Sequence, residues 1–373
     1  MLSRAALAAP LFATTLAAGS WRYANESAFE GQQSFGLGFV SKTTGVVAGQ
    51  LAIGSALWVT SDGAATFKPV DWTPFEFTDT AATQTGLVAC GDLFTGVLYS
   101  RDLGRTWNAS AGDGQGIQGC TTVRRAAFDA HGVAVVGQLG FDNVNALAVS
   151  TDDGISFERH DASAALVNVG AGYAALPNAS TWFVTGADVD ANGNPTAGQI
   201  AVTRNSGKSF ERVFTAPAGT AVFGIDCRSG DECCALTSTG TKAEIICTAN
   251  SGKKWNVSYT KVGGANTYLN DIRFEKVSDA YWAVGGVFGD VAWVLKSSAN
   301  FKTFAIDTTF AKSYGAAIEV AADGSGAMFG IVFETDPNDD SNDNYIITNL
   351  PKGAPVPPLR PAGSRLRASA ARL

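Results

Sequence analysis

An eight-residue pattern recurs along the chain and constrains the fold more than any other feature. Its clearest copy is SRDLGRTW at residues 100–107. Other copies begin at residues 60, 150, 203 and 248 and a degraded copy at residue 297, so successive starts lie 40 to 53 residues apart. Each copy follows a short apolar segment, and another apolar segment ending in glycine lies further upstream. This period accommodates four strands and their turns, and it predicts an all-β propeller of four-stranded antiparallel blades.

The end of the repeat region predicts one more blade. Residues 314–350 contain two or three further strand segments but no copy of the octet. A closed propeller has no exposed strand edges, so we expect residues 21–30 to pair beside the last blade and complete it. The sequence therefore predicts a single seven-bladed β-propeller over residues 20–350, with six blades and a terminal cap as the alternative.

The chemistry of the octet is that of a turn. The side chain at its third position accepts backbone N–H groups of the residues that follow, and a nearby glycine adopts positive φ. The closing Trp or Phe packs between blades. Because Asn replaces Asp in two copies and cannot act as a catalytic carboxylate, we interpret the position as structural. It is occupied by Asp62, Asp102, Asp152, Asn205 and Asn250.

The pattern S-x-D-x-G-x-T-W resembles the Asp-box, or BNR, repeat of β-propellers, with 100–107 and 150–157 as the best copies. Such repeats occur in sialidases, sortilin-type receptors, two-domain xyloglucanases and the photosystem II stability and assembly factor family. A single propeller with an apolar strand ending in glycine before each box is most similar to the last of these. The resemblance implies a non-catalytic scaffold in the thylakoid lumen that binds a protein partner. That family gathers arginines from several blades, whereas here only Arg124 and Arg125 stand together.

A carbohydrate-active propeller, either a glycoside hydrolase, a sialidase-like enzyme or a lectin, is the alternative function. Sialidases carry an Arg-Ile-Pro element before their first box, and this chain contains none. The arginines of the body also do not fall at matched blade positions: Arg124, Arg125, Arg212, Arg228 and Arg273. Sialidase activity is therefore disfavoured.

Other glycosidases need only two carboxylates about 5 to 10 Å apart across a cleft. Asp226, Asp271 and Glu319 lie near expected inner strands and are the candidates. We expect them to be channel-lining or turn acids, and we assign no catalytic residue. Carboxylates or arginines that converge from several blades would favour an enzyme, and a broad patch without convergence would favour a scaffold that binds a protein or glycan through one face.

Residues 188–199, DVDANGNPTAGQ, match the first half of a calcium-binding loop. The twelfth position is Gln199 instead of Glu and no helices flank the loop, so it is not an EF-hand; a polar hairpin is the alternative. A second acidic hairpin at 334–344 is expected on the same face of the ring. No other cofactor is predicted, and neither His131 nor His160 has a second ligand at suitable spacing. The candidate calcium ligands are Asp188, Asp190, Asn192 and Asn194.

Residues 1–19 have the early cation, apolar run and small residues of a signal peptide. We therefore expect the secretory pathway, with the outside of the cell or an organelle lumen as destination and the thylakoid lumen as alternative. An even number of cysteines fits this route. Their expected pairs are Cys227 with Cys233, Cys234 with Cys247, and Cys90 with Cys120, although other pairings are open. Candidate glycosylation sites are Asn25, Asn108, Asn178 and Asn256.

The formal net charge is −7, and the segment 351–373 holds five cations and no acid. The rest of the chain is therefore more acidic still, which argues against nucleic acid as a partner. The segment 351–373 is rich in proline and basic residues and is expected to be disordered. No later segment is apolar for long enough to cross a membrane, so we expect a protein that is not integral to a membrane. We also expect a monomer.

Overall fold

The computed structural model describes residues 21–24, 33–51, 54–73, 77–91, 96–111, 119–140, 144–187, 196–335 and 342–350. Strands β1 to β28 form in these ranges. No helix that could span a membrane occurs in them. The segments 1–19 and 351–373, assigned above to a signal peptide and a tail, lie outside the described residues.

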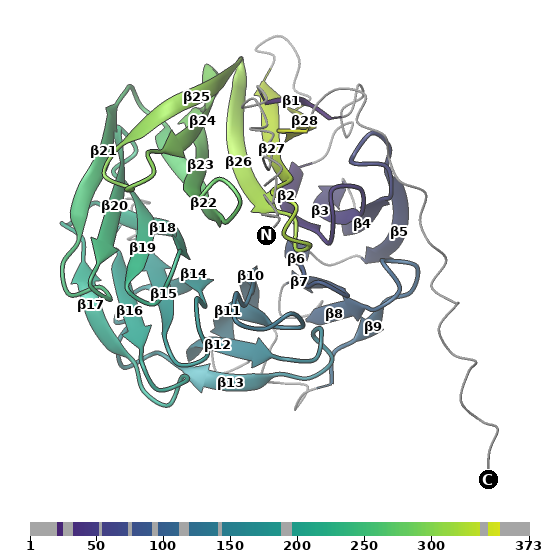
Figure 1. Cartoon of the computed structure of the whole chain (residues 1–373), viewed down its shortest axis with the longest axis horizontal. Coiled ribbons are helices and arrows are strands. Elements are labelled where there is room, and N and C mark those ends of the chain that lie inside the picture. Colours follow the sequence, from purple (N-terminus) through teal and green to yellow (C-terminus); the bar gives the residue numbers. More distant parts are fainter. Residues whose placement is uncertain are drawn as a thin grey trace, which may run out of the picture.

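The strands form seven antiparallel sheets of four strands each, which confirms the seven-bladed propeller. Each sheet is one blade, and its first strand lies nearest the centre of the ring (Figure 1).

From the inner to the outer strand, blade 1 is β2 (Gln33–Phe39), β3 (Gly45–Leu51), β4 (Gly54–Thr60) and β5 (Lys68–Thr73). Blade 2 is β6 (Phe77–Ala82), β7 (Leu87–Gly91), β8 (Val97–Ser100) and β9 (Asn108–Ala109). Blade 3 is β10 (Cys120–Arg125), β11 (Val133–Leu139), β12 (Val144–Ser150) and β13 (Glu158–Asp161). Blade 4 is β14 (Gly170–Ala175), β15 (Trp182–Ala187), β16 (Gln199–Thr203) and β17 (Glu211–Thr215). Blade 5 is β18 (Ala221–Cys227), β19 (Glu232–Ser238), β20 (Lys242–Ala249) and β21 (Asn256–Val262). Blade 6 is β22 (Thr267–Glu275), β23 (Ala280–Val287), β24 (Val291–Ser297) and β25 (Phe304–Ala311). Blade 7 is β26 (Ser313–Val320), β27 (Met328–Thr335), β28 (Asn342–Thr348) and β1 (Arg22–Tyr23).

The N-terminal segment closes the ring, as the sequence predicted. Strand β1 pairs with β28, with Arg22 opposite Thr348 and Tyr23 opposite Ile347. Trp21 is 4% exposed and packs edge-on against Trp282 of blade 6, with ring centroids 5.8 Å apart. Blade 7 therefore combines both ends of the described chain in one sheet.

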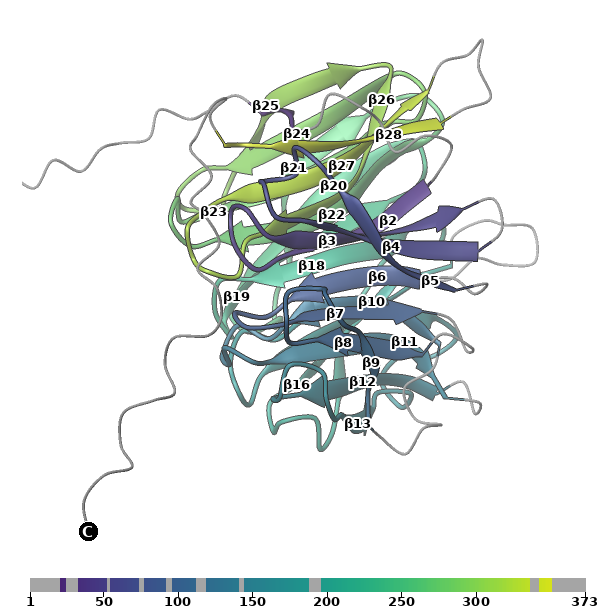
Figure 2. The same cartoon turned by 90° about the vertical axis from the view of Figure 1, so that its right-hand side faces the viewer.

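Hydrophobic clusters hold neighbouring blades together. Figure 2 shows successive blades from the side, where the inner strands β2, β6 and β10 follow one another. Between blades 1 and 7, Phe39 stacks on Phe329 with ring centroids 3.6 Å apart. The core is thus divided among the interfaces between blades, and each blade depends on its two neighbours.

The octets form tight turns between the third and fourth strands. Asp102 Oδ1 accepts the hydroxyl of Ser100 at 2.9 Å and the N–H of Thr106 at 2.8 Å, while Oδ2 accepts the hydroxyl of Thr106 at 2.7 Å. Gly104 has φ of +83°, and a side chain there would overlap Val59 of blade 1. The turn is therefore fixed by local bonds and lies close to the preceding blade.

The asparagine copies keep the same arrangement without a charge. Asn205 Oδ1 accepts the hydroxyl of Thr203 at 2.8 Å and the N–H of Ser209 at 3.0 Å. Its amide then donates to the hydroxyl of Ser209 at 2.9 Å, which reverses the direction of one bond. Every contact of the third position lies within its own turn, in agreement with a structural role.

The six cysteines form the three expected pairs. Cys90 in β7 is bonded to Cys120 in β10 and so joins blades 2 and 3. The other two disulfides, Cys227–Cys233 and Cys234–Cys247, connect neighbouring strands of blade 5. Three disulfides indicate an oxidising compartment.

Removing the closing tryptophan should destabilise the whole ring. We expect Trp21→Ala to lower the free energy of unfolding by about 3–5 kcal/mol, because a buried aromatic side chain is lost. Urea unfolding followed by tryptophan fluorescence and circular dichroism measures this. Val262→Ala, at a side chain that is 71% exposed, is the control and should change little. A Trp21→Ala variant as stable as the control would mean that β1 does not close the propeller.

We expect the octet turn to tolerate asparagine in place of Asp102 better than alanine. We expect Asp102→Ala to cost about 1–2 kcal/mol and Asp102→Asn less than about 1 kcal/mol, since Asn can make the same bonds. Burial by itself raises the pKa of Asp102, but the hydrogen bonds from Thr106 and Ser100 outweigh it, so the pKa lies below its usual value. Its stabilisation is present above the unfolded pKa and is lost as pH falls through the folded pKa. The difference in free energy of unfolding between the wild type and Asp102→Asn should therefore become smaller from pH 7 to pH 3. A difference that becomes larger would contradict this assignment.

Candidate functional site

The first strand of each blade lies nearest the centre of the ring and is the inner edge of its sheet. We call the central region that these strands surround the channel. In an antiparallel pair every second N–H group points away from the partner strand, so these edges carry N–H groups that no strand receives. Buried groups of this kind need another acceptor. Asp79 of blade 2 provides one, because its Oδ2 accepts the N–H of Val123 in blade 3 at 3.0 Å.

Two further acids join neighbouring blades in the same way. Oδ2 of Asp226 in blade 5 accepts the N–H of Phe274 in blade 6 at 2.8 Å. Oδ2 of Asp271 in blade 6 accepts the N–H of Ile318 in blade 7 at 3.2 Å. Two of the carboxylates considered as glycosidase candidates therefore bind backbone of the adjacent blade.

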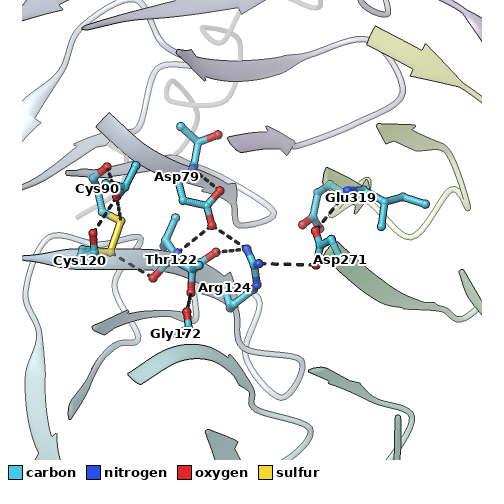
Figure 3. Close-up of polar contacts among 12 residues, drawn as sticks. Asp79, Cys90, Cys120, Thr122, Arg124, Gly172, Asp271 and Glu319 are labelled. Atoms are coloured by element: carbon cyan, nitrogen blue, oxygen red, sulfur yellow. Dashed lines mark hydrogen bonds and ion pairs between the residues drawn. A yellow bond between two sulfur atoms is a disulfide. The ribbon is translucent and has the colours of Figure 1, made fainter. Parts of the chain in front are cut away.

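Arg124 reaches across the channel between these acids (Figure 3). It comes from β10 and is 8% exposed. Its Nη1 donates to Oδ2 of Asp79 at 2.7 Å, and its Nη2 lies 3.6 Å from Oδ1 of Asp271. Blades 3 and 6 lie on different sides of the ring, so this contact spans the channel. Burial disfavours an isolated carboxylate, and the guanidinium offsets that cost.

Arg273 completes the charged network. Its Nη1 donates to Asp271, and its Nε donates to Oε2 of Glu319 at 3.0 Å. Arg124 and Arg273 each stand two residues after the point where pairing resumes beyond a β-bulge of the inner strand. The expectation that the arginines do not occupy matched blade positions is therefore wrong for these two. The loop after the inner strand is longer in blade 3, between Arg125 and Val133, than in blade 6, between Glu275 and Ala280, so counting back from the octets does not align the two arginines.

Asp79 was not among the residues singled out from the sequence. It directly follows the bulge of β6, as Asp271 follows the bulge of β22. The available signal is the acid at the same place in FTDT and LNDI, which becomes visible only when the inner strands are aligned on their bulges.

Burial governs the protonation of two of these acids. It raises the pKa of Asp79 to about 6, against the opposing effects of Arg124 and the N–H of Val123. Burial also raises the pKa of Asp226, against the attraction of Arg273. Both shifts have the direction expected when water is removed from a carboxylate.

The channel opens into a cavity of about 1100 Å³ on the face that carries the octet turns, which we call the turn face. Acids and bases from four blades converge there, and this is the pattern that the sequence analysis assigned to an enzyme. The charged side chains that line the cavity are Arg124, Arg125, Asp129, Asp226, Arg228, Arg273, Glu275, Lys276, Asp279 and Glu319.

The acids of this cavity are largely occupied by bonds within the protein. The two oxygens of Asp226 accept the N–H groups of Cys227 and Phe274. Both oxygens are likewise bonded in Glu275, Asp279 and Glu319. Among the lining acids, Asp129 alone has one oxygen without a bond to another described residue. Few carboxylate oxygens of the cavity are therefore available to contact a substrate.

Two cations of the cavity have no such partner. Arg125 is half-buried and Lys276 is exposed. Within the described ranges neither side chain makes an ion pair or a hydrogen bond. The groups available to a ligand on the turn face are therefore mainly positive.

The candidate calcium ligands Asp188, Asp190, Asn192 and Asn194 lie outside the described residues, as does most of the second acidic hairpin. No group of three His, Cys, Asp or Glu side chains suited to a metal ion occurs in the part of the chain that the structure describes. His131 instead lies 3.1 Å from Asp153 through Nδ1.

The candidate glycosylation sites differ in exposure. Asn108 in β9 and Asn256 in β21 are exposed on outer strands. Asn178 is half-buried, and its Oδ1 accepts the N–H groups of Ser180 and Thr181. Asn25 lies outside the described residues.

The fold and the channel define the class as a seven-bladed β-propeller with a charged central cavity, and several solved structures share this fold. No family model and no curated protein matches the sequence. The structure of YCF48 bound to D1 peptide is similar with a TM-score of 0.57 and 13% identity, covering 88% of this chain and 96% of that one. The GH74 xyloglucanase from Xanthomonas campestris has a TM-score of 0.54 and 11% identity, covering 80% and 50%. The Dos1 propeller has a TM-score of 0.53 and 12% identity, covering 88% and 94%. At these identities the likeness shows the fold alone.

Titration of the buried acid tests the electrostatics of the channel. We expect the carboxyl carbon of Asp79 to titrate near pH 6 by NMR, with Asp79→Asn giving the assignment. Because this pKa is raised on folding, its contribution to stability is fully present below the unfolded value of about 4 and is lost as pH rises through about 6. Arg124→Met should raise the pKa of Asp79 further. A midpoint near 4, or no effect of Arg124→Met, would contradict the described network.

Proposed function

We propose that this protein is a non-catalytic propeller scaffold that binds an acidic segment of a partner protein in the turn-face cavity. The observation that carries the proposal is that the acids of the cavity are mostly bonded within the protein, whereas two of its cations are not. Apart from one oxygen of Asp129, the carboxylate oxygens of the lining acids are bonded within the protein, while Arg125 and Lys276 make no bond to another described residue and are available to an anionic ligand. A cavity of about 1100 Å³ accommodates several side chains of an extended peptide.

A protein ligand is also consistent with the likeness in fold. The similar propeller YCF48 has been solved with a bound D1 peptide. This likeness adds a precedent for peptide binding by such a ring and does not identify the partner of this chain. The octets resemble the Asp-box repeat, and this resemblance also supports the proposed scaffold function.

The proposed partner shares an oxidising compartment with this protein. The disulfides support a secretory or lumenal location, and the features of residues 1–19 support export. The extracellular space and an organelle lumen, including the thylakoid lumen, are the compartments in which we place the interaction. Calcium at residues 188–199 and glycans at the exposed sequons are further proposals for the mature protein.

Catalysis is the second candidate, and one residue favours it. Asp226 lines the cavity, is half-buried and has a raised pKa, which are properties of a general acid. Both of its oxygens are nevertheless held by backbone N–H groups, and Glu319 is held by Arg273 and its own strand. A glycosidase would need one of these carboxylates to be released toward the substrate.

Peptide binding by matched charge variants tests the proposal. On an array of acidic, neutral and basic ten-residue peptides, we expect the protein to bind the acidic ones. The double variant Arg125→Gln, Lys276→Gln should weaken this binding about ten- to hundredfold, because each charged contact contributes about 1.5–3 kcal/mol less the cost of desolvation. Binding should also weaken as salt increases.

The control removes the same charge elsewhere. Arg212→Gln with Lys302→Gln changes two exposed cations outside the cavity and should leave peptide binding unchanged. Equal losses in both double variants would reduce the effect to net charge and contradict the proposed site. Turnover of a glycoside panel by the wild type that disappears in Asp226→Asn would replace the scaffold with an enzyme.

A further inference from the structure

A second cavity, of about 470 Å³, lies at the other end of the channel. It is formed where the inner strands of blades 3, 4 and 5 begin, whereas the turn-face cavity is formed where they end. Arg124 lies between the two, with its guanidinium 5.2 Å from the ring centre of Tyr173, which lines the second cavity. The channel therefore offers two separate sites.

The chemistry of the second cavity differs from that of the first. No charged side chain is among the described residues that line it. The residues with polar side chains that line it are Thr121, Gln138 and Tyr173. None of these three groups makes a hydrogen bond to another described residue. They are neutral donors and acceptors that remain available to a ligand.

An aromatic ring completes the lining. Phe223 is half-buried and is held edge-to-face by Tyr268 of the next blade, with centroids 6.3 Å apart. Aromatic side chains continue around this end of the ring, where Phe288, 51% exposed, packs against Tyr314 at 5.5 Å. The hydroxyl of Tyr314 is fixed by a bond to Asn270. Of these rings, Phe223 lines the cavity, and its contact with Tyr268 holds it in place.

We propose that this cavity binds a neutral pyranose unit of a saccharide. A pyranose carries several hydroxyls that both donate and accept, and these match the uncommitted groups of Thr121, Gln138 and Tyr173. Its C–H-rich face packs against an aromatic ring, whose face is electron-rich. No charged group among the described lining residues can pair with the carboxylate of a sialic or uronic acid, and the nearby guanidinium of Arg124 is already paired with Asp79 and Asp271. A neutral sugar therefore fits the cavity better than a charged one.

Gly172 makes the site accessible and testable. It lies in the bulge of β14, and a Cβ built on it would meet no atom within 4 Å. Its φ lies outside the left-handed region, so a side chain there causes no backbone strain. A larger residue at 172 would project into free space at the cavity. Gly264, in the loop between β21 and β22, has the same two properties but does not line the cavity.

Saccharide binding by the full-length protein tests the proposal. The probes are neutral oligomers of glucose, galactose, mannose and N-acetylglucosamine, with oligosaccharides ending in N-acetylneuraminic or galacturonic acid as charged counterparts. A glycan array identifies the ligand, and saturation-transfer NMR and calorimetry measure its affinity. We expect a neutral oligomer to bind, Gly172→Leu to weaken it at least about tenfold, and Tyr173→Phe to weaken it about tenfold, since one hydrogen bond is lost.

The controls distinguish this site from folding and from the turn face. Gly264→Leu should bind the neutral oligomer as the wild type does, and circular dichroism should show that all variants are folded. The double variant Arg125→Gln, Lys276→Gln should retain saccharide binding, so that failure of peptide binding and failure of this proposal can be separated. No binding of any neutral probe, a preference for the charged probes, or equal affinity of Gly172→Leu and Gly264→Leu would overturn the proposal.

Discussion

The hydrogen bond from an inner-strand N–H to a carboxylate of the preceding blade is the interaction on which the centre of this molecule depends. Each inner strand is the edge of its sheet, so its channel-facing N–H groups need acceptors that no strand supplies. Asp79, Asp226 and Asp271 provide them across three blade interfaces. These acids are then removed from water, and Arg124 and Arg273 compensate their charge. The charged channel thus follows from the need to satisfy backbone groups.

This origin explains why the acids and bases that converge at the centre of the ring are bonded mainly to one another and to the backbone. Most charged side chains of the turn-face cavity are bonded to each other and to the backbone, and among its described charged residues Arg125, Lys276 and one oxygen of Asp129 have no such bond. Arg124 also separates that charged cavity from a neutral, aromatic one at the other end of the channel. One ring therefore contains two chemically different cavities.

The sequence was sufficient where structure is local. The octet turns and the disulfide hairpins of blade 5 follow from short-range patterns. The pairing of β1 with β28 is long-range, and it was expected for residues 21–30 from the need to cover strand edges. The channel network was not accessible in that way. Asp79 and Asp271 are far apart in sequence, and only ring closure brings both to Arg124. Loops of different length follow the inner strands of blades 3 and 6, so spacing along the sequence does not show that Arg124 and Arg273 occupy equivalent places beyond their bulges.

A double-mutant cycle between Arg124 and Asp79 tests the central claim most directly. The free energy of urea unfolding at pH 7 would be measured for the wild type, Arg124→Met, Asp79→Asn and the double variant. The described network predicts a coupling of about 1–3 kcal/mol, because each partner is buried and depends on the other. Additive effects within about 0.5 kcal/mol would show that the two side chains do not act together, and would contradict a channel built on this ion pair.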